Sequence, residues 1–464
     1  MIRLPAPVSP GAAGAPDQRD QLILLTDLAR LIPVTDPSAD VVRIELMDRP
    51  ESFASVSAWR TAGWGIEPGD GVVRLARAGL QLAWDLATSQ AEIRSTARDK
   101  FGRVPAAANA LVAAGLEREP VVSQMAVALR QAATRAAGRR PLQVSAPWPE
   151  GRRWAVALTH DLDVVALWPL FTGLRLLELG RKGHWRLAAR AASQALRSIG
   201  RAPVERGAAG VLAAERARSM RSTWFVLCGT PTLKTFIDGD LTYRPEADAT
   251  RRILAAIARQ QHSFGLHGSR ETVSSSERFS AQRNRLLGLA GQAVEGVRQH
   301  FLRFDPARTP HAMAQAGFRY DSTVGFPDRN GFRIGLADVV PLREGMDEVP
   351  FAWMDRALSK YRGIEDPEAW IDEALALARS CRDVEGLWVG VWHPNLTDAL
   401  GFPGAPAAYE RLLDGLLADR PFVGTLDAMV AWRAERRAVR IERMAEDGRY
   451  ELGAAASVPL ESAG

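Results

Sequence analysis

The sequence predicts an α/β fold in which a sheet of seven strands forms a distorted (β/α) barrel, preceded by a smaller α+β domain. Two observations predict it. From Trp154 onwards short apolar runs alternate with helical stretches, whereas the residues before Trp154 show no regular alternation. The chain also has 464 residues, 47% of them hydrophobic, which is enough for two domains.

The first part of the chain mixes helices and strands. Residues 1–20 are rich in Pro, Gly and Ala and are expected to be flexible. An accessory α+β domain is predicted over 21–145, followed by a linker with prolines and charges over 138–153. Its predicted helices and strands are helix 17–31, strands 41–46, 72–75 and 80–84, and helices 105–115 and 121–137. No convergent set of catalytic residues is visible there.

The barrel is predicted over 150–440. Its expected strands are 155–159, 222–227, 263–267, 296–301, 347–351, 387–393 and 422–425. In such folds the chemistry collects at the carboxyl ends of the strands. The tail, 453–464, is expected to be disordered.

Residues 164–221 are predicted to be a helical insertion that emerges at the active-site end of the first strand. The insertion holds 11 Arg or Lys against 3 Asp or Glu. It could be a lid, or a docking surface for an anionic substrate or a peripheral membrane contact. A helical pair with a solvated basic face is the alternative, and such pairs are the more frequent case.

The overall charge gives little support to nucleic-acid binding. The net charge is +5 and the isoelectric point about 9.5, but the arginines alternate with acidic residues and no basic stripe carries interleaved aromatics. Cys228 and Cys381 lie far apart and are expected to be reduced thiols. The first twenty residues lack the pattern of a secretory signal and no run of about 18 apolar residues occurs, so a cytoplasmic location is predicted.

The stretch 154–163, WAVALTHDLD, ends a predicted strand in ionisable side chains. Asp161 and Asp163 are two residues apart, so both point to the same side of an extended chain. Two carboxylates held that close favour a bound cation. The alternative is that one caps the next helix and the other is solvated.

Four of the seven histidines stand at or just beyond predicted strand ends: His160, His267, His300 and His393. Such clustering favours a site over four separate core histidines. At the end of the last long strand, LWVGVWHPN, His393 suits general acid or base chemistry, although it could be an interfacial histidine beside Trp392.

These motifs resemble the polysaccharide deacetylase superfamily, the NodB-homology fold of carbohydrate esterase family 4, and most of all a divergent branch with a THDxD first motif. The resemblance covers roughly 154–436. It is carried in order by THDLD at 159–163, STWFV at 222–226, HSFGLHGS at 262–269, GVRQHFLRF at 296–304, GFRYDST at 317–323 and VWHPN at 391–395.

The resemblance implies a metal-dependent amidase acting on N-acetyl groups of amino sugars. It implies Asp161 as the base, Asp163 and His267 as ligands of a divalent cation such as Zn²⁺, and His393 as the acid that protonates the leaving amine. The arginine that orients the base in family members matches Arg298 best and Arg303 second.

The sequence departs from the family where a second metal histidine usually follows His267 by four residues, because that position is Glu271. The third ligand could be Glu271, His160 or His300, or the metal could be lost. His300 is favoured, since its strand should end at the same face. Arg333, on the Gly-flanked loop GFRIG, is a candidate for binding a carboxylate or phosphate of the substrate, or a surface arginine in a turn.

The predicted function is deacetylation of an N-acetylated sugar, either free or linked to a lipid or nucleotide, as a precursor of a cell-surface or secreted polysaccharide. One alternative is a metal-free carbohydrate-binding pseudoenzyme or scaffold that kept the barrel. Another is hydrolysis of a non-sugar amide by the same machinery. The sequence leaves the oligomeric state open.

Overall fold

The computed structural model describes residues 1–4, 18–48, 55–140, 142–165, 168–200, 202–444, 450–452 and 458–463. Its strands are β1 (Ile2–Arg3), β2 (Val42–Met47), β3 (Ile66–Gly69), β4 (Val72–Ala76), β5 (Gln143–Ser145), β6 (Ala155–Leu162), β7 (Thr223–Leu227), β8 (Ser263–Gly268), β9 (Val294–Gln299), β10 (Tyr320–Asp321), β11 (Val340–Arg343), β12 (Met346–Glu348), β13 (Trp353–Met354), β14 (Leu387–Val391), β15 (Phe422–Val423), β16 (Ile441–Met444), β17 (Tyr450–Leu452) and β18 (Leu460–Ser462).

The α-helices are α1 (Gln18–Leu28), α2 (Val56–Thr61), α3 (Arg77–Ala87), α4 (Gln90–Arg94), α5 (Ala110–Ala114), α6 (Val121–Ala137), α7 (Trp168–Arg181), α8 (Trp185–Arg197), α9 (Pro203–Ala217), α10 (Leu233–Ile237), α11 (Asp248–Arg259), α12 (Ser276–Ala290), α13 (Thr309–Gln315), α14 (Pro367–Asp383), α15 (Ala405–Leu417) and α16 (Leu426–Ala438). The 3₁₀ turns are η1 (Gly63–Gly65), η2 (Ala106–Ala108), η3 (Pro149–Gly151), η4 (Arg270–Thr272), η5 (His300–Leu302) and η7 (Asp398–Leu400), and η6 (Ala357–Arg362) is a π-helical turn. Among the described residues no helix is both long and apolar enough to cross a bilayer.

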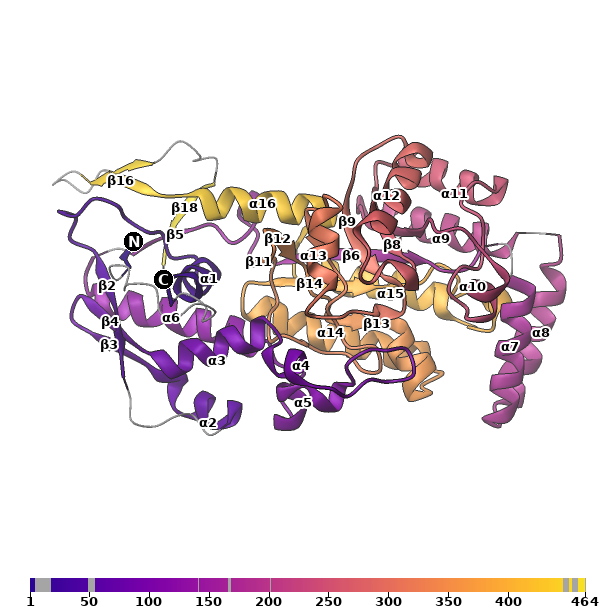
Figure 1. The fold of residues 1–464 in the computed structure, drawn as a ribbon, viewed down its shortest axis with the longest axis horizontal. Helices are drawn as coiled ribbons and strands as arrows, with labels where there is room; N and C mark the ends of the chain where they lie inside the picture. Colours follow the sequence, from indigo (N-terminus) through magenta and orange to yellow (C-terminus); the bar gives the residue numbers. More distant parts are fainter. Residues whose placement is uncertain are drawn as a thin grey trace.

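The central sheet has ten strands in the order β11-β12-β10-β9-β8-β7-β6-β14-β13, with β15 also paired to β6 (Figure 1). It curls into a half barrel, and in the described residues its edge strands β11 and β13 do not pair with each other. Strand β6 lies at the centre and is buried along its whole length, which fits its continuous apolar run. Its parallel neighbours β7 and β14 place their carboxyl ends at the same edge of the sheet.

The predicted count of seven strands is too low. Each of the seven expected runs overlaps a strand of this sheet, and these strands are β6, β7, β8, β9, β12, β14 and β15; β12 and β15 cover only two residues of the expected ranges 347–351 and 422–425. The other three, β10, β11 and β13, have two to four residues each. Such strands are too short to show an alternating pattern in the sequence.

The N-terminal part forms a four-stranded sheet in the order β1-β2-β4-β3, against which α6 packs. The run 80–84, expected as a strand, lies inside α3, because its apolar side chains share one face with those of neighbouring turns. The core of this part also contains Val324, Ile334, Leu336 and Val340 from the second half of the chain. The predicted boundary near residue 145 therefore does not separate two independent cores.

Both termini lie at the end of the molecule that holds the four-stranded sheet (Figure 1). The predicted flexible segment 1–20 lies mostly outside the described residues, but β1 pairs with β2 and α1 begins at Gln18. Disorder was likewise expected over the tail 453–464, of which 453–457 lie outside the described residues. Residues 460–462 form β18, which pairs with β5, because the exposed edge of β5 offers its backbone groups.

Candidate metal centre and active site

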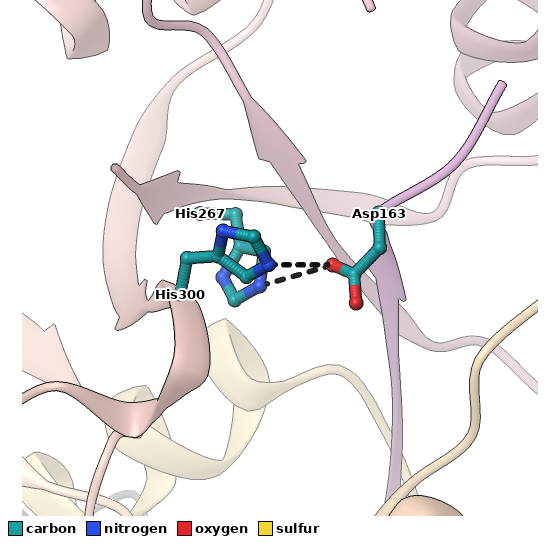
Figure 2. A group of neighbouring side chains, drawn as sticks. All are labelled: Asp163, His267 and His300. Carbon is teal, nitrogen blue, oxygen red and sulfur yellow. Dashed lines mark ion pairs between the residues drawn. The ribbon is translucent and has the colours of Figure 1, made fainter. Parts of the chain in front are cut away.

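The carboxyl ends of β6, β8 and β9 bring three predicted metal-binding residues together. Asp163 follows β6, His267 lies near the end of β8, and His300 follows β9. His267 Nε2 lies 3.3 Å and His300 Nε2 3.8 Å from Asp163 Oδ1 (Figure 2). The ligand atoms of the three residues all lie within 4.8 Å of one another. This spacing fits one cation bound by two imidazoles and a carboxylate.

The hydrogen bonds around the two histidines leave the right atoms free for a cation. His267 Nδ1 lies 2.8 Å from the backbone oxygen of Arg298, and His300 Nδ1 lies 3.0 Å from Asp240 Oδ1. Because both partners are acceptors, each Nδ1 carries the proton and each Nε2 can offer its lone pair. Asp163 Oδ1 is buried and accepts no hydrogen bond from any described residue. A cation is the partner that these three atoms fit.

The turn that presents His300 is strained. Phe301 and Leu302, directly after it in η5, have φ angles of 58° and 53°. Such left-handed conformations cost about 1 kcal/mol or more for residues with a Cβ, and they tend to persist at functional sites. Here they turn the chain sharply after β9 and leave the His300 side chain facing Asp163.

Asp161 is held by the buried guanidinium of Arg298. Arg298 Nη1 donates to Asp161 Oδ1 and to Thr159 Oγ1, both at 2.8 Å, and the other nitrogens donate to Ser322. Burial alone would raise the pKa of Asp161, but Arg298 and then His267 hold the pKa below its usual value. Asp161 is therefore ionised at neutral pH and fixed in orientation.

His393 faces Asp163 from the end of β14. Its Nε2 lies 3.5 Å from Asp163 Oδ2, and its Nδ1 lies 2.6 Å from Asp355 Oδ1. Burial alone would lower the pKa of His393, but the charge and hydrogen bond of Asp355 outweigh it and raise the pKa to about 9. The imidazole is thus protonated at neutral pH and suited to donate a proton from Nε2.

One small cavity of about 80 Å³ is lined by Asp161, Asp163, His267, His300 and His393. Its wall includes Arg103 of the N-terminal part, which donates to the backbone oxygen of Phe301 at 3.0 Å. Arg356, which directly follows Asp355 in sequence, and Lys360 also line the cavity. The sequence analysis did not identify Asp240, Asp355 or the cationic rim formed by Arg103, Arg356 and Lys360. The nearest signal for the rim is the series of positive charges in RALSKYR at 356–362, a pattern that is also typical of a solvated helix face.

Two of the candidate third ligands, Glu271 and His160, lie away from the cavity. Glu271 is exposed and pairs with Arg278, because η4 turns it toward solvent. His160 is buried on the other side of β6, where its Nε2 lies 2.8 Å from Glu215.

Arg333 was expected either to bind an anionic group of the substrate or to be a surface arginine in a turn, and the structure shows neither surrounding. Its guanidinium is buried and forms an ion pair of 2.8 Å with Glu92, and it also donates to the backbone oxygens of Gly325 and Val104. Four of its five N–H donors form hydrogen bonds inside the protein, and Arg333 does not line the cavity of the candidate site. It joins the N-terminal part to the barrel instead.

Arg303, the second choice for the arginine that orients the base, donates to the backbone oxygen of Arg270 at 3.1 Å. The structure therefore brings Arg298 and not Arg303 to Asp161.

No family model matches the chain, and no curated protein does. Solved structures are similar. One is a protein assigned as a polysaccharide deacetylase from Mycobacterium smegmatis, with 23% identity over 66% of this chain and 97% of that one at a TM-score of 0.42.

Two others have lower identity. A chitin deacetylase from Colletotrichum lindemuthianum has 14% identity over 64% of this chain and 91% of that one, with a TM-score of 0.33. A family 4 pseudoenzyme from Bacillus anthracis has 10% identity over 61% and 66%, with a TM-score of 0.30. By their names these three solved structures are a polysaccharide deacetylase, a chitin deacetylase and a pseudoenzyme of carbohydrate esterase family 4, and the motifs of this chain resemble the polysaccharide deacetylase superfamily.

Proposed function

We propose that the protein is a metal-dependent hydrolase that removes an acetyl or related acyl group from the nitrogen of a sugar. The observation that carries the proposal is the triangle of Asp163, His267 and His300 beside a buried Asp161–Arg298 pair and an Asp355-bound His393. A cation site flanked by an ionised carboxylate and a protonated imidazole offers a proton acceptor and a proton donor on either side of an amide, which suits metal-assisted hydrolysis.

Asp163, His267 and His300 would hold the cation, and Zn²⁺ suits their nitrogen and oxygen atoms. When bound, a divalent cation lowers the pKa of water and polarises a carbonyl group. The protein itself supplies a preformed triangle, so the ion would bind without large rearrangement. Both histidines already hold the tautomer that binds a metal.

Asp161 acts as the proton acceptor in this proposal. Arg298 occupies its Oδ1, so Oδ2, which lies 3.7 Å from His267 Nε2, faces the cavity. Arg298 keeps the carboxylate ionised and oriented, so Asp161 can take a proton from the attacking water.

His393 acts as the proton donor. The Asp355 carboxylate holds its Nδ1–H, which directs Nε2 toward the cavity. Protonation of the nitrogen is needed before the sugar amine can leave, since a free amide anion is a poor leaving group. His393 can deliver that proton because it is protonated at neutral pH.

The substrate proposed is an N-acetylated sugar, either free or linked to a lipid or a nucleotide, made in the cytoplasm as a precursor of a surface polysaccharide. The sequence resemblance to deacetylases supports the acetamido group.

The test compares three variants of the full chain. Asp163→Ala should lose the bound metal, measured by elemental analysis after zinc reconstitution. Asp161→Asn should keep the metal and lose release of acetate and amine from N-acetylated sugars. Glu271→Gln is the matched control, since Glu271 is exposed and paired with Arg278; it should keep both.

Two outcomes would contradict the proposal. Full metal uptake without acetate release from any N-acetylated sugar would indicate a metal-binding scaffold. Less than a tenth of an equivalent of metal in the reconstituted wild-type protein, again without turnover, would indicate a metal-free pseudoenzyme.

A further inference from the structure

Two positively charged side chains, Arg356 and Lys360, line the candidate site and do not pair with a carboxylate of any described residue. Arg356 and Lys360 line the same cavity as Asp163 and His393. Among the described residues neither forms an ion pair: Arg356 donates to Ser359 Oγ at 3.2 Å, and the Lys360 ammonium makes no hydrogen bond. Most buried or half-buried arginines of this chain, in contrast, pair with a carboxylate, as Arg103 on the same rim does with Asp99 at 2.7 Å.

Aromatic rings surround these cations. The Lys360 ammonium lies 5.5 Å from the ring centre of Tyr361 and 5.8 Å from those of Phe101 and Phe301. Phe101 and Phe301 stack with their centres 5.2 Å apart. Lys360 sits on the π-helical turn η6, a conformation that is rare and often found at functional sites. Flat aromatic faces next to a cation suit a sugar that carries a negative charge.

The acidic side chains of the site are engaged with other partners. Asp161 accepts a hydrogen bond from Arg298 at 2.8 Å, Asp355 lies 2.6 Å from His393 Nδ1, and Asp240 lies 3.0 Å from His300 Nδ1. None of these carboxylates pairs with Arg356 or Lys360, which leaves the two side chains as surplus cations.

The electrostatics of Lys360 agree with this surplus. Although its side chain as a whole is exposed, desolvation of the ammonium and then repulsion by Arg356 lower the pKa of Lys360 to about 8. Repulsion of this kind is relieved when an anion binds between the cations.

We propose that Arg356 and Lys360 bind an anionic group of the substrate, a phosphate or a carboxylate carried by the acylated sugar. This inference rests on the proposed function, because it assigns the substrate class of the same site. The guanidinium offers a fork of donors and the ammonium a point charge, which is the usual pair of groups for an oxyanion. The substrate is then a charged acetamido sugar rather than a neutral one.

The experiment measures binding by calorimetry with N-acetylglucosamine, its 1-phosphate, and the corresponding N-acetylated uronic acid. The 1-phosphate or the uronic acid should bind at least about tenfold more tightly than the neutral sugar, since a charge-assisted hydrogen bond contributes that much. The preferred anion tells whether phosphate or carboxylate is recognised.

Lys360→Met and Arg356→Met should each remove about tenfold of that preference while leaving the affinity for the neutral sugar unchanged. Lys234→Met is the matched control, an exposed lysine of α10 outside the cavity. Asp163→Ala should retain the preference, which excludes direct binding of the anion to the metal. Thermal unfolding of each variant checks that it is folded.

Equal affinity for all three sugars, or the same loss in Lys234→Met as in Lys360→Met, would overturn the inference. The two proposals fail separately. A preference for the anion without acetate release refutes the proposed deacetylase and keeps the anion site. Acetate release at equal rates from neutral and charged sugars would support the proposed deacetylase and refute the anion site.

A second feature, independent of the cavity, is the exposed apolar face of the helical pair α7–α8. These helices project at the end of the molecule opposite the termini (Figure 1). Six large apolar side chains on α7, α8 and the residues just after α8 are 49–69% exposed: Leu170, Leu174, Leu177, Trp185, Leu196 and Ile199. In α7 they recur at spacings of four and three residues, so they form one stripe.

Basic residues accompany this stripe. Arg181, Arg186, Arg190 and Arg197 are exposed and form no ion pair with any described residue. Exposed leucines and a tryptophan beside unpaired arginines are the pattern of helices that lie in the surface of an anionic bilayer. We infer that the α7–α8 pair binds the surface of a membrane that contains anionic lipid. The excess of Arg and Lys over Asp and Glu in residues 164–221 complements the negative charge of such a surface.

Sedimentation with lipid vesicles tests this inference. The protein should bind vesicles that contain phosphatidylglycerol more strongly than vesicles of phosphatidylcholine alone, and high salt should weaken the binding. The double variant Leu174→Glu/Leu177→Glu should release the protein. Leu287→Glu is the matched control, because Leu287 is an exposed leucine on α12.

Binding that does not depend on the anionic lipid would overturn the inference. So would a wild-type dimer in size-exclusion chromatography that the same double variant converts to monomer, since the stripe would then be an interface between two copies of this chain.

Discussion

Replacing Glu215 by alanine should destabilise the protein by about 3–5 kcal/mol, because it leaves three buried polar groups without the carboxylate that they share. Glu215 lies on α9 and is completely buried. Its carboxylate accepts hydrogen bonds from Ser222 Oγ at 2.8 Å and from Tyr409 Oη at 2.6 Å, and lies 2.8 Å from His160 Nε2. The other ring nitrogen of His160 faces the backbone oxygen of Trp392.

The magnitude follows from these three partners. A hydrogen bond to a charged group contributes about 1.5–3 kcal/mol, so three of them contribute more than the expected loss. Removing the carboxylate also removes the cost of burying it, which amounts to several kcal/mol and offsets part of that loss. Glu215→Gln keeps the shape of the side chain, but its amide NH₂ group would face at least one of the groups that donate to the carboxylate, such as the Ser222 or Tyr409 hydroxyl. We therefore expect this variant to lose about 2 kcal/mol of unfolding free energy.

The assay is equilibrium unfolding in urea at pH 7. Glu205→Ala is a control on the same helix, since Glu205 pairs with the exposed Arg252 and should cost no more than about 1 kcal/mol. If Glu215→Ala unfolds with the same free energy as Glu205→Ala, the buried network does not stabilise the fold and the reasoning is refuted.

The pH dependence gives a second reading of Glu215. Burial alone would raise the pKa of Glu215, but His160 and the other partners outweigh it and hold the pKa below its usual value. A carboxyl group with a depressed pKa contributes stability above its unfolded pKa and loses it as the pH falls through the folded one. The loss of stability on acidification below about pH 4.5 should therefore be shallower in Glu215→Gln than in the wild type. An identical slope would contradict this assignment.

Three further predictions concern the site and its sheet. Asp355→Asn should lower the pKa of His393 from about 9, so the alkaline fall in turnover should move to lower pH; an unmoved profile would exclude His393 as the donor. Zinc at about a hundred times its dissociation constant should stabilise the wild-type protein by about 2.7 kcal/mol, and Asp163→Ala should not respond, as followed by thermal unfolding. Gly296→Ala should destabilise the protein by about 1–3 kcal/mol in urea, because its methyl group would collide with the ring of Tyr320, and an unchanged midpoint would contradict that packing.

The parts of the site that the sequence predicts are those that end long strands. Asp161 lies near the end of the eight-residue strand β6, Asp163 follows that strand, and His267 lies in the six-residue strand β8. Runs of this length show their apolar pattern, so their ends and the side chains placed there can be located.

The parts that the sequence does not predict depend on tertiary contacts. Asp355 follows the two-residue strand β13, which has no pattern of its own, yet it holds His393 at 2.6 Å. Asp240, which holds His300, lies in a loop 60 residues away from it. Arg333 stands on a Gly-flanked loop that is typical of a binding site, and only the position of Glu92 shows that it is engaged elsewhere.

The candidate metal site has a third side chain, His300, although the position four residues after His267 is not a histidine. The residue four positions later, Glu271, lies on η4, which points away from the cavity. In the parallel pairing of β8 with β9, His267 stands opposite Arg298, so His300 lies two residues further and faces the same side. A ligand from the neighbouring strand end therefore reaches the position that a ligand from the following turn would occupy. The strained turn after His300 and the contact of its Nδ1 with Asp240 fix the orientation of this side chain, and both support the proposed role of His300 as a metal ligand.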